Sequence, residues 1–149
     1  MTVTPRFVSL PAMLFAGVRR HHALADAPRD IPRQWEDFEA LPLAHAPSVR
    51  YGVTCAFDGA AQRMEYLCAV EVTTFDGLLE GTGRMRVPAA HYAVFDLHGS
   101  PAGIPHLWQQ VMHWEATNPA WRDGHTPTFE RYEQGAVSIW MPVVPRADT

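Results

Sequence analysis

Lysine is absent from this sequence of 149 residues, and all 12 basic residues are arginines. Cysteine is scarce, since only Cys55 and Cys68 are present, which excludes a disulfide framework. The longest apolar run, residues 11–18, is far too short to cross a bilayer, and no signal peptide is visible. A net charge of −4 offers no basic surface to nucleic-acid phosphates. We therefore expect a cytoplasmic protein that binds neither membranes nor nucleic acids.

The sequence also lacks the common catalytic and metal-binding motifs. It contains no phosphate-binding glycine loop, no G-x-S-x-G, no H-E-x-x-H and no C-x-x-C. His21 and His22 are adjacent, so on a strand they would point to opposite faces. His106 and His113 would lie about 10.5 Å apart along a helix, too far for one ion. We expect neither a metal nor a cofactor.

An internal repeat of about seventy residues is the strongest positive signal. The pattern P-A-x-x-aromatic-A occurs at 11–16 and 88–93, and I-P-x-x-W occurs at 31–35 and 104–108. Arg50-Tyr51 then matches Arg131-Tyr132, and the segment 68–72 can be aligned with 139–143. Four matches in one order predict two halves, residues 7–72 and 84–143, within a single domain that covers 1–149.

Each half is predicted to fold as strand, helix, strand, strand. The first half has a strand at 13–22, a helix that Asp30 caps and Pro42 ends, and a hairpin of strands 49–57 and 64–72. The second half has a strand at 84–97, a helix at 104–116 and strands at 128–133 and 137–143; we expect a linker at 73–83 and an irregular loop at 118–127. The fold class is therefore α+β, with antiparallel sheets related by a pseudo-two-fold axis. Because one helix covers only one face of each sheet, we expect a central ligand cleft between the two uncovered faces.

The repeat predicts which residues meet in that cleft. It pairs Trp35 with Trp108, Tyr51 with Tyr132, and Ala69 with Trp140. It also pairs Glu130 with Val49, so a single carboxylate breaks the symmetry. Aromatic rings beside one acid suit a flat, apolar ligand, because ring faces stack on it. They also suit a flat cation, because ring faces attract positive charge and the acid supplies the countercharge. Core packing is the alternative explanation for the aromatic residues.

Glu71 is a second candidate acid. It lies two residues beyond Ala69 on the same strand face and would reach the mouth of the cleft. Two acids beside one pocket can supply a general base, and His91 or His113 could do the same. The simpler explanation for Glu71 is a solvated side chain at the rim.

Three motifs resemble the GyrI-like superfamily, which contains the AraC-type effector-binding and bacterial multidrug-sensing domains. They are P-A-x-x-Y-A-V-F at 88–95, F-E-R-Y at 129–132 and I-W-M-P-V at 139–143. The resemblance extends from about residue 7 to residue 144 and implies a duplicated fold with a ligand cleft between the halves. In multidrug-sensing relatives the acid of the F-E-x-Y motif attracts cationic aromatic drugs, which implies this role for Glu130. The resemblance further implies that Trp140, Trp108 and Trp35 line the cleft.

Relatives of this kind occur fused to DNA-binding domains, as gyrase inhibitors and as hydrolases of cyclopropane-containing compounds. The sequence leaves no segment for a DNA-binding domain, so we expect a stand-alone small-molecule-binding protein for sensing or sequestration, and not an enzyme. A hydrolase of reactive aromatic or cyclopropanoid compounds, with Glu130 as the catalytic residue, remains an alternative. A gyrase-inhibitor-like role in protein interaction is the other.

Overall fold

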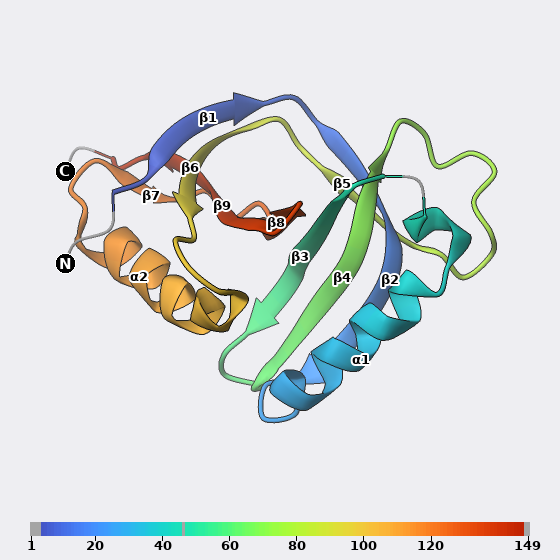
Figure 1. The fold of residues 1–149 in the computed structure, drawn as a ribbon. Helices are drawn as coiled ribbons and strands as arrows, with labels where there is room; N and C mark the ends of the chain where they lie inside the picture. Colours follow the sequence, from blue (N-terminus) through green and yellow to red (C-terminus); the bar gives the residue numbers. More distant parts are fainter. Residues whose placement is uncertain (1–3, 46, 148–149) are drawn as a thin grey trace.

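The computed structural model describes residues 4–45 and 47–147 and contains one curved sheet and two helices (Figure 1). In chain order the elements are β1 (Arg6–Leu10), β2 (Met13–Ala23), α1 (Ala27–Glu39), the 3₁₀ turn η1 (Pro42–Ala44), β3 (Val49–Asp58), β4 (Arg63–Val72), β5 (Gly83–Val87), β6 (Ala90–Asp96), the 3₁₀ turn η2 (Pro101–Gly103), α2 (Ile104–Thr117), β7 (Trp121–Asp123), β8 (Thr128–Glu133) and β9 (Ala136–Pro145). The strand order is β1-β6-β9-β8-β3-β4-β2-β5, with β7 paired to β9. Every strand pair is antiparallel. The prediction of an antiparallel α+β fold is confirmed.

The strand order is symmetric about its centre. Strands β8 and β3 pair in the middle, β9 and β4 flank them, and β6 and β2 follow. The segment β2-α1-β3-β4 is therefore related to β6-α2-β8-β9 by a pseudo-two-fold operation. This is the strand-helix-strand-strand arrangement that the repeated motifs indicate.

The repeated Pro-Ala pair marks the same bend in both halves. Pro11 and Ala12 separate β1 from β2, and Pro88 and Ala89 separate β5 from β6. The prediction of one strand over 84–97 is therefore wrong, because proline has no N–H to donate to the sheet ladder. Each half thus has an additional leading strand, and each leading strand pairs with the other half: β1 with β6, and β5 with β2. Neither β1 nor β7 was predicted.

The first helix also begins earlier than expected. It starts at Ala27, one turn before the predicted cap at Asp30, and ends at Glu39. Pro28 lies in the first turn, where its missing N–H costs nothing. The second helix, Ile104–Thr117, extends one residue beyond the prediction.

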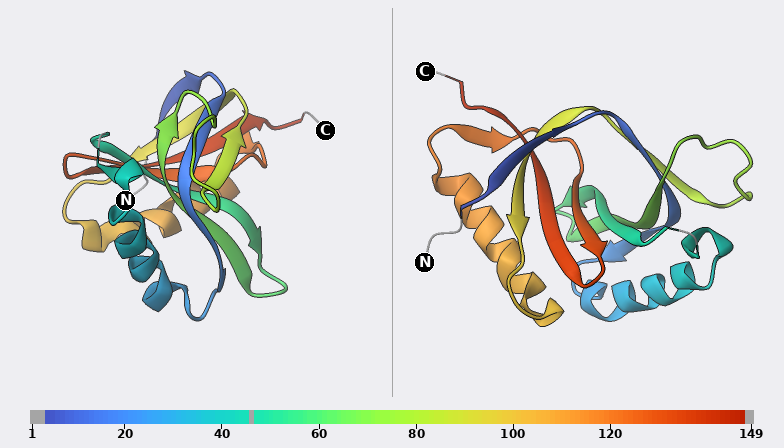
Figure 2. Two further views of the ribbon diagram at one scale, coloured as in Figure 1. Left: turned by 90° about the vertical axis from the view of Figure 1, so that its right-hand side faces the viewer. Right: turned by 45° about the horizontal axis from the view of Figure 1, so that its top comes forward.

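The two faces of the sheet differ in what covers them. Both helices lie outside the curve of the sheet, on what we call the outer face (Figures 1 and 2). There α1 packs over a cluster that includes Phe38, Cys68 and Val70, and α2 packs over a cluster that includes Phe95 and Ile139. On the opposite, inner face the two halves share one apolar cluster: Met13, Phe15, Tyr51, Val53, Leu67, Ala69, Val87, Tyr92, Val94, Phe129 and Trp140.

Side chains fill the middle of the inner face. Phe15, Tyr92 and Phe129 have no exposed surface, so these three side chains pack tightly at the centre of that face. Within residues 4–45 and 47–147, neither helix is long and apolar enough to cross a membrane.

Candidate ligand site around Glu130

Glu130 lies on the outer face at the junction of the two halves. Strand β8 pairs with β3 there, and Glu130 stands opposite Gly52. Its side chain is only 7% exposed, yet it accepts three hydrogen bonds from both halves of the chain. Tyr66 and Tyr132 donate their hydroxyl protons to Oε1 at 2.7 and 2.8 Å, and Trp108 donates Nε1–H to Oε2 at 2.7 Å. The carboxylate is therefore satisfied entirely by neutral donors.

Burial keeps both tyrosines in their donor form. Burial raises the pKa of Tyr66 well above its ordinary value, and the neighbouring Glu130 raises it further. The same two causes raise the pKa of Tyr132. Both hydroxyls keep their protons at neutral pH, and the Trp108 indole can only donate. All three groups therefore act as donors to Glu130.

Glycine at position 52 makes this arrangement possible. A Cβ atom there would lie 1.9 Å from the Tyr66 hydroxyl and 2.7 Å from Oε1 of Glu130. No side chain can occupy that space without displacing the carboxylate or its donor. A glycine inside a strand indicates close approach of other groups, and it was the signal that the sequence analysis overlooked.

The helix α1 supplies the second tryptophan. Trp35 packs edge-on against Tyr132 and Tyr66, with ring centroids 5.6 and 6.3 Å apart. The preceding residue, Gln34, fixes the helix to the sheet: its Nε2 donates to the carbonyls of Val18 and Tyr66 at 2.8 and 2.9 Å. Trp108 therefore contacts Glu130 directly, and Trp35, from the other helix, contacts two of the side chains that donate to Glu130.

The other three predicted site residues lie on the inner face. Tyr51, Ala69 and Trp140 belong to the inner apolar cluster, whereas Glu130, Tyr132, Trp108 and Trp35 meet on the outer face. The sheet separates the two groups, so they do not form one cleft. Ala69 is fully buried and lines neither of the two cavities described below.

The proposed pairing of Tyr51 with Tyr132 is wrong by three residues: Tyr51 pairs with Ala69 and Phe129 with Trp140, so the two-fold operation relates Tyr51 to Phe129. Tyr51 stands opposite Arg131, and Tyr132 stands opposite Arg50. A two-fold operation keeps each side chain on its own face, so Tyr51 cannot be equivalent to Tyr132. A shift by any odd number of residues moves every side chain of a strand to the opposite face. The pairing of Glu130 with Val49 fails for the same reason.

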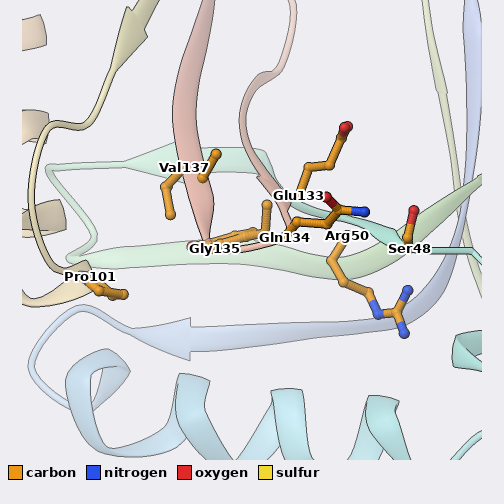
Figure 3. A pocket seen from close by; sticks show the side chains of 9 residues that line it. Ser48, Arg50, Pro101, Glu133, Gln134, Gly135 and Val137 are labelled. Carbon is orange, nitrogen blue, oxygen red and sulfur yellow. The ribbon is translucent and has the colours of Figure 1, made fainter.

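A cavity of about 300 Å³ opens beside Tyr132. It lies between the β8–β9 turn, the start of β3 and the turn before α2 (Figure 3). Arg50 lines it and is held by Glu39 at 3.0 Å. Tyr132 is the one residue that both lines this cavity and donates to Glu130.

A second cavity, of about 470 Å³, opens at the rim of the inner face. Glu71, the second candidate acid, lines this cavity and not the surroundings of Glu130. Its lining consists of Arg6, Leu10, Pro11, Met13, Tyr51, Glu71, Phe129, Arg131 and Trp140.

The thiols and histidines form no further centre in the part of the chain that the structure describes. Both cysteines are free; Cys68 is buried on the outer face, and Cys55 packs against the inner cluster. Burial raises the pKa of Cys55 to about 11. No group of three His, Cys, Asp or Glu side chains among residues 4–45 and 47–147 is arranged to hold a metal ion.

Comparison with known proteins identifies the family. The profile of the integron-associated effector binding protein family, Cass2, matches residues 6–143. The chain belongs to this family. Cass2 is GyrI-like, in agreement with the superfamily that the three motifs resemble. No curated protein sequence matches the chain.

Solved structures share the Cass2 fold at low sequence identity. The Vibrio cholerae integron cassette protein VCH_CASS2 has a TM-score of 0.76 and 20% identity, covering 96% of this chain and 98% of its own. SAV2435, solved with bound tetraphenylphosphonium, has a TM-score of 0.76 and 18% identity, covering 94% and 93%. The C-terminal domain of EcmrR has a TM-score of 0.64 and 14% identity, covering 97% and 99%. At these identities the likeness establishes the fold.

Within this Cass2 member, sequence reasoning missed Tyr66 as a site residue. Tyr66 precedes Ala69 by three positions on β4, so it points to the opposite face. The predicted site included the face of Ala69, whereas the Tyr66 side chain lies on the other face.

Proposed function

We propose that this effector-binding protein takes up flat aromatic cations on the outer face, with Glu130 as the countercharge. The observation that carries the proposal is the environment of Glu130: a buried carboxylate with three neutral donors. Among the described residues 4–45 and 47–147, no arginine or histidine lies within ion-pair distance of it. Its charge is thus available to a ligand.

The aromatic residues around Glu130 suit such a ligand. Both tryptophans are half-buried: Trp108 donates to the carboxylate, and Trp35 packs against the donors Tyr66 and Tyr132. Tyr132 also lines the cavity. Cation–π contact with a tryptophan contributes about 0.5–2 kcal/mol, more when water is excluded. The bound tetraphenylphosphonium of SAV2435 is also an aromatic cation, which supports the proposed class. We also propose that the chain acts as a single cytoplasmic domain in sensing or sequestration.

Matched ligands test the role of Glu130. N-methylacridinium and acridine, at a pH where acridine is neutral, have nearly the same outline and differ in charge. We expect wild type to bind the cation at least about tenfold more tightly in isothermal titration calorimetry, since a hydrogen-bonded or paired charge contributes about 1.5–3 kcal/mol. Glu130→Gln should lose this preference while its affinity for acridine stays the same.

The control is Glu36→Gln, which removes an exposed carboxylate beside Trp35 on α1. This variant should keep the preference for the cation. An unchanged preference in Glu130→Gln, or an equal loss in both variants, would contradict the proposal. Mass spectrometry of the same mixtures with a cyclopropanoid substrate added distinguishes binding from hydrolysis, because product that depends on Glu130 would favour the hydrolase alternative.

A further inference from the structure

The inner-face cavity has an aromatic floor. The rings of Trp140 and Phe129 stack with centroids 5.7 Å apart and planes 12° apart, and Tyr51 meets Phe129 edge-on at 5.6 Å. The Arg6 guanidinium lies 5.6 Å from the centre of the Trp140 ring. All of these residues line the same cavity of about 470 Å³. It is large enough for a bicyclic ring system.

Charges of both signs surround this floor without meeting. Arg6 and Arg131 line the cavity, and so does Glu71. Glu71 forms no ion pair with either arginine, although all three belong to the described part of the chain. Strands β4 and β8 both pair with β3, which places Glu71 and Arg131 on strands about 9.5 Å apart. Tyr51 of β3 lies between them.

Both guanidiniums already have carboxylate partners outside the cavity lining. Asp96 accepts from Nε and Nη2 of Arg6 at 2.8 and 3.1 Å, and Glu133 accepts from Nη2 of Arg131 at 2.5 Å. Each guanidinium has five N–H donors, so both can still donate to a ligand. A ligand that carries only a negative charge would leave Glu71 without a partner, and a ligand that carries only a positive charge would face two arginines.

We propose that the inner-face cavity is a second binding site, for an aromatic compound that carries both an amine and a carboxylate. Its ring packs against Trp140 and Tyr51, its carboxylate accepts from Arg131 and Arg6, and its amine donates to Glu71. This site uses the opposite face of the sheet from Glu130 and does not depend on the function proposed above. The two sites are therefore expected to bind independently.

Three indoles that carry different charged groups test the site. L-tryptophan carries both charges, tryptamine only the positive one, and indole-3-acetate only the negative one. We expect calorimetry at neutral pH to give L-tryptophan the highest affinity. Glu71→Gln should weaken L-tryptophan and tryptamine about tenfold and leave indole-3-acetate unchanged. Arg131→Gln should weaken L-tryptophan and indole-3-acetate by a similar factor and leave tryptamine unchanged.

Unchanged binding of indole-3-acetate by Glu71→Gln, and of tryptamine by Arg131→Gln, shows that each variant is folded. Glu80→Gln and Arg63→Gln, which alter exposed charges outside the cavity lining, are the matched controls and should bind all three indoles as wild type does. Saturating tetraphenylphosphonium should leave L-tryptophan affinity unchanged. Absence of L-tryptophan binding at millimolar concentration, equal affinity for the three indoles, or displacement by tetraphenylphosphonium would each overturn the proposal.

Discussion

The two faces of the sheet use similar residues in different electrostatic settings. On the outer face one buried carboxylate is surrounded by neutral donors from Tyr66, Tyr132 and Trp108. On the inner face, acidic and basic groups line one cavity and stay apart. Glu130 and Arg131 are adjacent in sequence, yet each belongs to a different face. Alternation along a strand thus places neighbouring residues in two chemically distinct environments.

The largest effect is expected for Phe129→Ala, because Phe129 is the centre of the inner face. It is fully buried and contacts the rings of Phe15, Tyr51, Tyr92 and Trp140. Truncation of a buried phenylalanine lowers the free energy of unfolding by about 3–5 kcal/mol. Urea denaturation measures the loss.

Phe57→Ala is the control for that substitution, since Phe57 is 65% exposed. Its effect on the free energy of unfolding should stay within about 0.5 kcal/mol. Similar losses in both variants would mean that Phe129 does not organise the inner face.

A smaller effect is expected for Gly52→Ala, which acts on the outer face. The added methyl group must displace the Tyr66 hydroxyl or Glu130 Oε1, and overpacking of this kind costs about 1–3 kcal/mol. The variant should also lose its preference for N-methylacridinium while it retains L-tryptophan binding on the inner face. Gly59→Ala, where the nearest atom would lie 3.6 Å away, is the control and should change neither. Equal loss of both ligands would show that the two faces are coupled.

The smallest effect is expected at alkaline pH. Burial and Glu130 raise the pKa of Tyr66 and Tyr132 in the folded protein. A raised pKa means that the folded state holds its protons longer than the unfolded state, so this contribution to stability is complete below about pH 10 and declines as pH rises further. Urea denaturation between pH 8 and pH 11 should show a falling free energy of unfolding, with a shallower slope in Tyr66→Phe. A slope that Tyr66→Phe leaves unchanged would contradict this assignment.

Local patterns were sufficient to predict most elements of the fold. The strand 128–133 has the predicted bounds, and the I-P-x-x-W repeat correctly placed Trp35 and Trp108 on equivalent helices. A motif such as I-P-x-x-W spans a full helical turn. An error of one residue in the predicted start of the helix therefore does not change which helix carries the tryptophan. Residues on helices were therefore the more reliable part of the candidate site.

Strand residues were less predictable because a strand repeats every two residues. The match of Arg50-Tyr51 to Arg131-Tyr132 was off by three positions, an odd number, which exchanged the faces of Tyr51 and Tyr132. The same effect hid Tyr66. The partner of each leading strand could not be predicted either, since pairing between distant strands depends on the tertiary fold.

The exchange of leading strands has a consequence for how the chain holds together. Strand β1 pairs with β6 in the half that contains α2, and β5 pairs with β2 in the half that contains α1. Each half therefore contributes one edge strand to the other. A proteolytic cut in the largely exposed connection at 73–82 would yield two interlocked fragments that co-migrate under native conditions and separate only in denaturant. The two halves of this single chain thus exchange their leading strands in the way that the subunits of a domain-swapped dimer do. Because one connection joins the halves, they are always made in equal number.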